Sequence, residues 1–207
     1  MNKILEIFRK NKDDIIKPVA VLLVICIIIP LALSLTNKIT VDRIAELERK
    51  NAAETMQSLI VADTFEKAYF GADNAFEYYK AIKNGDTVGY IFNTFESGYG
   101  GEISVMTAVN PDGTVKSVSI LDASNETPGL GQNVTKENFY TQFEGKRKGV
   151  KVVKNGAVSE NNEIDAVTGA TISSSAVTSA VNKALDRFNL ISAISNTNES
   201  GVVTDEK

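Results

Sequence analysis

Histidine is absent from this 207-residue sequence, and Cys26 is its single cysteine. Zinc sites built on His or Cys, iron–sulfur clusters, His-ligated haem, Ser-His-Asp triads and Cys-His dyads all need more of these residues than the chain has. Any redox chemistry would therefore need a borrowed cofactor.

An excess of positive charge is also lacking. Residues 1–37 contain five of the 22 basic and three of the 26 acidic residues, so residues 38–207 have 17 basic against 23 acidic residues and a net charge of −6. This part of the chain is a poor candidate for binding nucleic acid. With 43% hydrophobic residues in the whole sequence, it is expected to fold as one domain with a hydrophobic core.

Charge is missing altogether from residues 18–37. As a helix, twenty residues span about 30 Å, the thickness of the hydrocarbon core of a bilayer, so we predict a transmembrane helix over 18–37. Two alternatives are a buried helix of a soluble domain and a cleavable signal peptide with a small-x-small site at Ala32-Leu33-Ser34. The run is longer than the usual apolar region of a signal peptide, about 7–15 residues, which favours a retained anchor.

Basic residues on the two sides of this run predict its orientation. Five lie before it, and Lys38, Arg43, Arg49 and Lys50 lie after it. The bias predicts a cytoplasmic tail over 1–17 and an extracytoplasmic region over 38–207 of a single-pass protein in contact with the lipid of a bacterial cell membrane.

The spacing of apolar residues changes along the outer region. Residues 38–83 begin with helical spacing in an Ala-, Glu- and Lys-rich stretch, and we expect a helical stalk there. The ranges 87–95, 101–109 and 115–121 are rich in β-branched and aromatic residues and predict three strands. Between the last two, Asn110-Pro111-Asp112-Gly113 predicts a tight hairpin turn.

Shorter elements follow. We expect a helix over 138–143, strands over 150–153 and 164–167 on either side of the turn Asn155-Gly156, and a packed helix from Ser173. Residues 192–207 are expected to form a polar tail. The prediction is an α+β protein: one transmembrane helix, then a domain over 84–191 with a small antiparallel sheet flanked by helices.

The segment Asp165-Ala166-Val167-Thr168-Gly169-Ala170-Thr171-Ile172-Ser173-Ser174 joins the last strand to the last helix. It combines a tight Gly turn with hydroxyl residues at a helix N-terminus, where free N–H groups and the helix dipole favour a phosphate. Taken alone, the segment is more typical of an ordinary N-cap, which is the commoner use of Ser and Thr at this place.

The same segment resembles the flavinylation motif Asp-x-x-(Ser/Thr)-Gly-Ala-Thr of FMN-binding domains. The resemblance implies that Thr171 is joined to FMN by a phosphoester, and that Asp165 is needed by the flavin transferase that attaches it. Thr168, Gly169, Ala170, Ser173 and Ser174 would then lie around the phosphate.

Two further stretches, Gly98–Ile103 and Glu126–Gly131, resemble signatures of the G subunit of the Rnf electron-transport complex and of the related C subunit of the sodium-translocating NADH:quinone reductase. The compact region between anchor and strands favours the Rnf protein. Glu126, Thr127, Gly129 and Leu130 are the candidate wall facing the flavin ring, and the alternative for them is a surface turn. The family often has a His where this sequence has Ser124.

The resemblance implies an electron-carrier subunit with covalent FMN. It would act in a membrane complex that couples electron transfer between ferredoxin and NAD to translocation of Na⁺ or H⁺, beside other Rnf subunits. No stand-alone catalytic activity and no metal site are expected. The competing hypotheses are a membrane-anchored binding or scaffolding module without flavin, in which Thr171 only caps the helix, and a flavin-dependent sensor.

Overall fold

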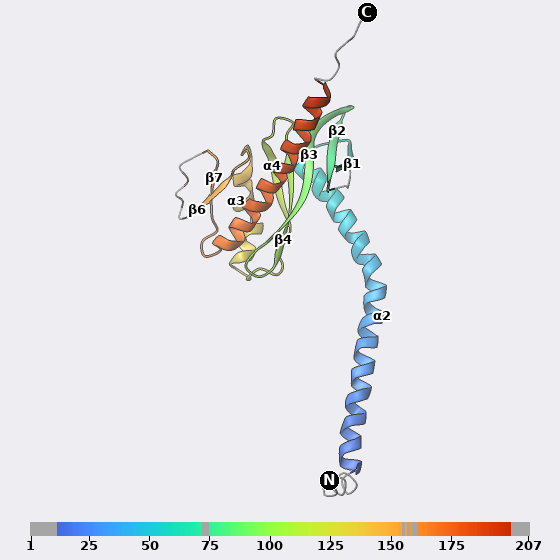
Figure 1. The fold of residues 1–207 in the computed structure, drawn as a ribbon. Coiled ribbons are helices and arrows are strands. Elements are labelled where there is room, and N and C mark those ends of the chain that lie inside the picture. The colour runs from blue at the N-terminus through green and yellow to red at the C-terminus, as the bar shows by residue number, and fades with distance from the viewer. Residues whose placement is uncertain (1–11, 72–74, 155, 157, 159–160, 200–207) are drawn as a thin grey trace, which may run out of the picture. The chain divides into compact units, whose positions relative to one another are not determined.

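The structure is a computed structural model that describes residues 12–71, 75–154, 156, 158 and 161–199. The chain divides into two compact units between Ala52 and Ala53. The described part of the first unit is helical, and the second unit contains the described strands (Figure 1).

One long helix, α2 (Lys12–Leu59), begins the described chain. Its segment Lys17–Lys38 has a mean hydropathy of 2.9 and is long and apolar enough to cross a membrane. The exposed fraction of its large apolar side chains runs from 45% at Ile25 to 68% at Leu31. Moving apolar surface out of water gains about 25 cal/mol per Å². A helix that is apolar on every side gains this free energy on all its faces when lipid surrounds it. The predicted span 18–37 coincides with this candidate.

Five strands form one antiparallel sheet in the second unit, in the order in which they follow along the chain. They are β1 (Thr64–Phe70), β2 (Phe76–Lys83), β3 (Asp86–Ser97), β4 (Glu102–Val109) and β5 (Val115–Asp122). The three strands predicted from β-branched and aromatic residues are confirmed as β3, β4 and β5. A simple meander of this kind needs only short turns between neighbours.

Two of these turns show their sequence basis. Asn84 and Gly85 join β2 to β3 with φ angles of +54° and +92°, the left-handed pair that a tight hairpin requires. The predicted turn at 110–113 is confirmed: the N–H of Gly113 donates to the carbonyl of Asn110 at 2.9 Å, and Gly113 has φ +81°. These turns fix the register of the sheet.

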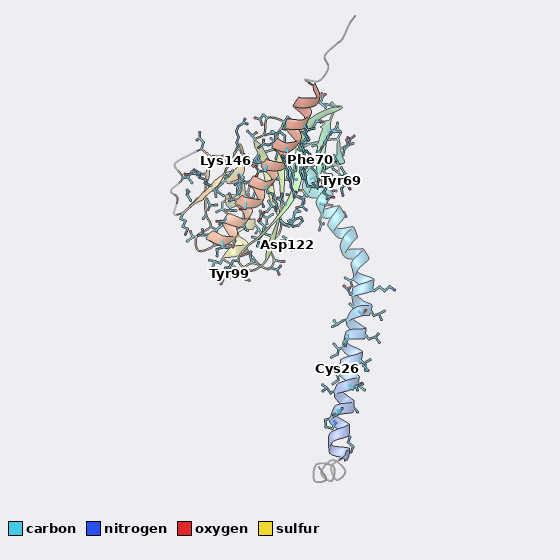
Figure 2. The ribbon with its side chains drawn as sticks, in the orientation of Figure 1. Cys26, Tyr69, Phe70, Tyr99, Asp122 and Lys146 are labelled. Carbon is cyan, nitrogen blue, oxygen red and sulfur yellow. The ribbon has the colours of Figure 1, made fainter. Side chains whose placement is uncertain are left out.

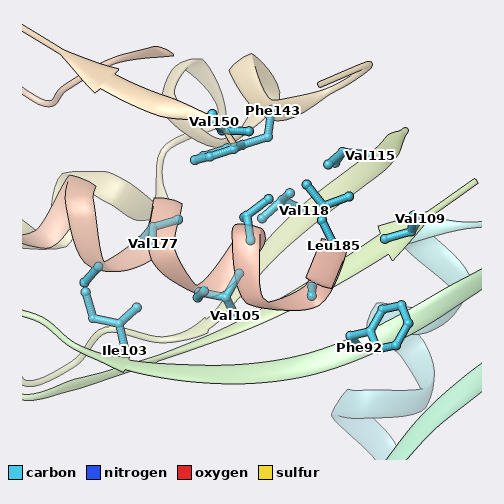
Figure 3. Close-up of a cluster of buried hydrophobic side chains, with 14 of the residues drawn as sticks. Phe92, Ile103, Val105, Val109, Val115, Val118, Phe143, Val150, Val177 and Leu185 are labelled. Carbon is cyan, nitrogen blue, oxygen red and sulfur yellow. The ribbon is translucent and has the colours of Figure 1, made fainter. Parts of the chain in front are cut away.

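Helix α4 (Thr171–Glu199) covers one face of the sheet and packs on β3 and β4. Alternate strand residues meet its apolar stripe in the main core (Figure 3), which includes Phe92, Ile103, Val105, Val109, Val115, Val118, Val177, Ala180, Val181, Ala184, Leu185 and Phe188. The helical spacing predicted from Ser173 onward is thus the packing face of α4, and the helix begins at Thr171.

The end of α2 packs within the second unit. Met56, Leu59 and Ile60 are each 6% exposed. The hydroxyl of Ser117 on β5 donates to the carbonyl of Leu59 at 2.6 Å, and Ile60 fills the space above Gly89, where a Cβ would lie 2.6 Å from its Cδ1. Ser117 and Gly89 belong to the opposite register from the α4-facing residues, so this helix end covers the other side of the sheet.

The chain between β5 and α4 completes the domain. It comprises the 3-10 helix η1 (Gly131–Thr135), α3 (Glu137–Tyr140), the 3-10 helix η2 (Thr141–Phe143), β6 (Lys151–Val153) and β7 (Glu163–Asp165). Phe139 and Phe143 are buried and meet edge to face, with ring centroids 5.8 Å apart. The short helix expected over 138–143 corresponds to α3 and η2.

The prediction of a helical stalk over 38–83 is wrong beyond Leu59. Residues 64–83 lie largely in β1 and β2, where alternate aromatic side chains pack against the core and the rings of Phe70 and Phe76 stack at 4.8 Å. Their Ala, Glu and Lys content favours a helix locally, but pairing with β3 and burial of the aromatic residues favour strands. The folded unit accordingly begins near Ala53 instead of residue 84.

Two smaller expectations also differ. Strands β6 and β7 exist, but they pair in parallel, with Lys151 opposite Glu163, so the turn at 155–156 does not close a hairpin between them. Asn155 itself lies outside the described residues. The tail predicted over 192–207 is helical up to Glu199, and residues 200–207 and 1–11 lie outside the described residues.

Candidate functional site

A sharp turn connects β7 to α4. The N–H of Ala170 donates to the carbonyl of Val167 at 2.9 Å, and Gly169 has φ +78°. A Cβ at Gly169 would lie 2.9 Å from Cδ1 of Leu130. The left-handed backbone is the reason that glycine is favoured here, and glycine also leaves the Leu130 side chain room to lie over the turn.

The first backbone hydrogen bond of α4 runs from the N–H of Ser174 to the carbonyl of Ala170, at 2.9 Å. Within the described part of the chain, the N–H groups of Thr171, Ile172 and Ser173 have no partner. Three free donors at the positive end of a helix dipole make an anion-binding surface.

The hydroxyl groups of the first turn of α4 have different roles. Ser174 Oγ donates to the carbonyl of Ala170 and accepts from the N–H of Val167, both at 3.0 Å, so it holds the turn against the helix. Ser173 Oγ donates to Glu126 Oε2 at 2.7 Å. The hydroxyl of Thr171 forms no hydrogen bond with any residue that the structure describes, and the side chain is half-buried. Among the described residues it therefore accepts no capping hydrogen bond from the start of the helix.

Glu126 joins three distant segments. Its side chain is 2% exposed, and its carboxylate accepts from Ser173 on α4 and, through Oε1, from the N–H of Gly100 at 3.1 Å. A Cβ at Gly98 would lie 2.1 Å from Oε1, and one at Gly131 2.3 Å from Oε2. Gly98 and Gly131, one glycine from each signature stretch, thus leave room for this side chain.

These segments enclose a pocket of about 490 Å³. Large apolar side chains on its wall are exposed, to 71% at Tyr99, 56% at Ile172 and 41% at Leu130. Figure 2 places Tyr99 at the end of the domain where α4 begins. No Lys or Arg is among the lining residues, which are Tyr99, Glu126, Thr127, Leu130, Gly131, Gly169, Ala170, Thr171, Ile172 and Ser173. The site combines apolar walls, free N–H donors and a free hydroxyl.

The structure brings seven of the ten residues proposed from sequence to this pocket, namely Glu126, Thr127, Leu130, Gly169, Ala170, Thr171 and Ser173. Three do not line it. Thr168 lines a separate hollow of about 500 Å³ together with Lys136 and Gln142. Ser174 is buried in the helix start, and Gly129 lies in the turn before η1, where its carbonyl accepts from Asn133 Nδ2 at 2.7 Å.

Three further residues line the pocket. Gly131 ends the stretch Glu126–Gly131 that the sequence offers as the wall of the flavin site. Sequence reasoning missed the other two: Tyr99 is aromatic, and an aromatic residue is more often part of a core than of a ligand site, whereas Ile172 lies four residues before Ala176, a spacing that suggests burial. The useful signal for both is their place within the motifs.

Asp165 and Ser124 have structural contacts of their own. The Asp165 carboxylate accepts from the N–H of Gly156 at 2.9 Å, and its main-chain N–H donates to Gln142 Oε1 at 2.8 Å. The N–H of Ser124 donates to the Asp122 carboxylate at 2.8 Å, and this bond lowers the pKa of Asp122 below its usual value. The described residues contain no group of acidic or sulfur side chains that would hold a metal ion.

Comparisons with known proteins agree with this geometry. The FMN-binding domain family matches residues 98–186. The G subunit of the proton-translocating ferredoxin:NAD(+) oxidoreductase complex of Clostridium ljungdahlii is 36% identical over 180 residues, covering 86% of this chain and 94% of that protein. The G subunit of the Na(+)-translocating ferredoxin:NAD(+) oxidoreductase complex of Acetobacterium woodii is 35% identical, covering 83% of this chain and 90% of that protein.

Among solved structures, NqrC of Shewanella oneidensis has a similar fold, with a TM-score of 0.51 and 22% identity over 66% of this chain and 73% of that one. The pocket also fits FMN by its chemistry. Its volume is within the range of small-molecule sites, its walls are apolar as a flat aromatic ring requires, and the free N–H groups of α4 suit the phosphate.

Proposed function

Because the chain belongs to the G-subunit family of ion-translocating oxidoreductase complexes, in which it is an FMN-carrying electron-transfer protein, we propose that its FMN is esterified to the hydroxyl of Thr171. The observation that carries this proposal is the state of that hydroxyl. It lies on the pocket wall beside three free N–H groups and has no hydrogen-bond partner among the described residues.

Different residues around Thr171 would bind the phosphate and the ring of FMN. The N–H groups of Thr171, Ile172 and Ser173 and the dipole of α4 would offset the charge of the phosphate, because none of the described residues that line the pocket is Lys or Arg. Leu130 and Ile172 offer apolar surface to the ring and exclude water from it. When bound, FMN supplies transfer of electrons singly or in pairs, and the ester keeps it from dissociating.

The partners follow from the names of the relatives. Those complexes transfer electrons between ferredoxin and NAD(+), and we extend this activity to a complex that contains this chain. A chain with a single cysteine cannot hold an iron–sulfur cluster, and its sequence has no Gly-x-Gly-x-x-Gly fingerprint of a nicotinamide site, so the sites for ferredoxin and NAD would belong to other subunits. Attachment of FMN would need a separate flavin transferase.

The same proposal places the chain in the cell membrane. The segment Lys17–Lys38 is the candidate span. Five basic residues before it favour a cytoplasmic N-terminus and an extracytoplasmic FMN domain. Protease added to intact spheroplasts is expected to digest residues after Lys38 and to leave the N-terminal tail intact, and the reverse pattern would exclude this orientation.

Substitution of Thr171 tests the attachment. Wild-type chain made together with a flavin transferase is expected to be heavier by one FMN less one water and to fluoresce in a denaturing gel. Thr171→Ala removes the ester oxygen and should abolish both signals completely. Intact-mass spectrometry measures the difference, and it also separates this function from a flavin-free scaffold.

Two further variants make the result specific. Thr171→Ser keeps a hydroxyl at the same place and should retain part of the added mass. Ser175→Ala removes an exposed hydroxyl from the same helix and should keep all of it. If Thr171→Ala carried FMN as the wild type does, the assignment of the ester to Thr171 would be wrong.

A further inference from the structure

Among the described residues that line the pocket, Glu126 carries the one acidic side chain. The side chain is buried, both oxygens act as hydrogen-bond acceptors, and their donors are a hydroxyl and a backbone N–H, both uncharged. No Lys or Arg in the described ranges forms an ion pair with it. A negative charge in this position is solvated by two dipoles and has no neutralising partner.

The surroundings of Glu126 leave it little freedom to move. The space beside its oxygens would be closed by a Cβ at Gly98 or Gly131, and Ser173 ties it to the first turn of α4, two residues from Thr171. Any ligand tethered to Thr171 and seated in the pocket therefore meets this carboxylate in a fixed place.

We infer that Glu126 is a residue that lowers the redox potential of the FMN in this pocket, an inference that rests on the attachment proposed above. Reduction of FMN by two electrons and one proton leaves one additional negative charge on the ring. A carboxylate beside the ring opposes that charge, because a partly buried pair of like charges is screened less than one in water. Oxidised FMN is favoured relative to its reduced form as a result.

A purely structural role for Glu126 would have different consequences. As a bridge between the loop at 98–101, the loop at 126–131 and α4, it would affect the yield of folded protein and the attachment of FMN. A purely structural role would not make the redox potential of FMN rise when the charge of Glu126 is removed and fall when only the hydrogen bond from Ser173 to that charge is removed. That contrast is the basis of the experiment.

The experiment is a spectroelectrochemical titration of the full-length, detergent-solubilised chain with FMN attached. Glu126→Gln keeps the shape of the side chain and removes the charge. Even two charges about 12 Å apart at an effective dielectric constant of about 20 change an equilibrium constant about tenfold, so reduction should become at least about tenfold more favourable, or at least about 30 mV for a two-electron couple. Glu137→Gln removes an exposed charge on α3 and should leave the potential unchanged.

Ser173→Ala provides the test of opposite sign. It keeps the carboxylate and removes a donor that disperses its charge, so the potential should fall. Should Glu126→Gln fail to fold, the direction of the Ser173→Ala shift decides alone. A potential that is unchanged or lower in Glu126→Gln, or unchanged or higher in Ser173→Ala, overturns the inference. Absence of FMN from the wild-type mass would instead overturn the proposed function, and this inference with it.

Discussion

At the scale of single residues, the same functional group has different uses within a few ångströms. The hydroxyls of Ser173 and Ser174 are both engaged in hydrogen bonds at the start of α4, whereas that of Thr171 is free among the described residues. The resemblance to the flavinylation motif singles out Thr171, but it does not say what engages the two serines. The partner of Ser173 is Glu126, 47 residues away along the chain, and no local pattern predicts a contact of that range.

Removal of two other threonine hydroxyls, those of Thr107 and Thr94, is expected to change the free energy of unfolding in opposite directions. Thr107 Oγ1 is buried without a hydrogen-bond partner in the described structure, while Thr94 Oγ1 donates to the carbonyl of Ala180 at 3.0 Å. Leaving a buried polar group unpaired costs about 1–3 kcal/mol, so Thr107→Val should raise the free energy of unfolding by about 1 kcal/mol. Thr94→Val should lower it by about 1 kcal/mol. Urea denaturation followed by circular dichroism measures the free energy of unfolding of both variants. If both changes had the same sign, the hydrogen-bonding difference between Thr107 and Thr94 would be contradicted.

At the scale of elements, the sequence predicts what local patterns determine. Strands β3, β4 and β5 are confirmed because β-branched and aromatic residues coincide with clear turn residues, and α4 because its apolar residues keep helical spacing. Strands β1 and β2 were missed, since their Ala, Glu and Lys content favours a helix and only pairing with β3 selects a strand. Strands β6 and β7 were expected, but their parallel pairing was missed, because the turn residues between them favour a hairpin locally.

The turn between β4 and β5 gives a prediction about pH. The Asp112 carboxylate accepts from the hydroxyl of Thr114 at 2.6 Å and from its N–H at 3.0 Å, and these bonds lower the pKa of Asp112 below 3.8. A carboxylate with a lowered pKa in the folded state stabilises it above the unfolded pKa, and the contribution is lost as the pH falls through the folded pKa. Asp112→Asn should therefore be less stable than the wild type at pH 7.

That difference should close as the pH is lowered below about 4, where the wild-type carboxylate begins to take up its proton. Thermal unfolding at a series of pH values follows it. Thr114→Val removes the larger of the two causes and keeps the carboxylate, so its deficit at pH 7 should also close in acid. A deficit of Asp112→Asn that persists unchanged at low pH would show that the turn is stabilised in some other way.

At the scale of the whole molecule, the anchor and the domain share one helix. Residues up to Ala52 belong to one compact unit, yet the last turns of α2 belong to the other, where Met56, Leu59 and Ile60 are buried. Full burial of each such side chain contributes about 1.5–3 kcal/mol. The helix that contains the candidate membrane span thus ends with its last apolar side chains buried in the second unit.

Two truncated chains test whether the folded unit begins near Ala53 or at residue 84. A chain of residues 53–207 keeps the end of α2, β1 and β2, so it should be soluble, unfold cooperatively and accept FMN from a flavin transferase. A chain of residues 84–207 exposes the edge of β3 and uncovers Ile91 and Met106, which are at most 2% exposed in the intact domain. It should aggregate or lose its cooperative transition, as measured by circular dichroism on heating. Cooperative unfolding of 84–207 at the same temperature as 53–207 would instead mean that the end of α2 and the first two strands add nothing to the stability of the FMN site.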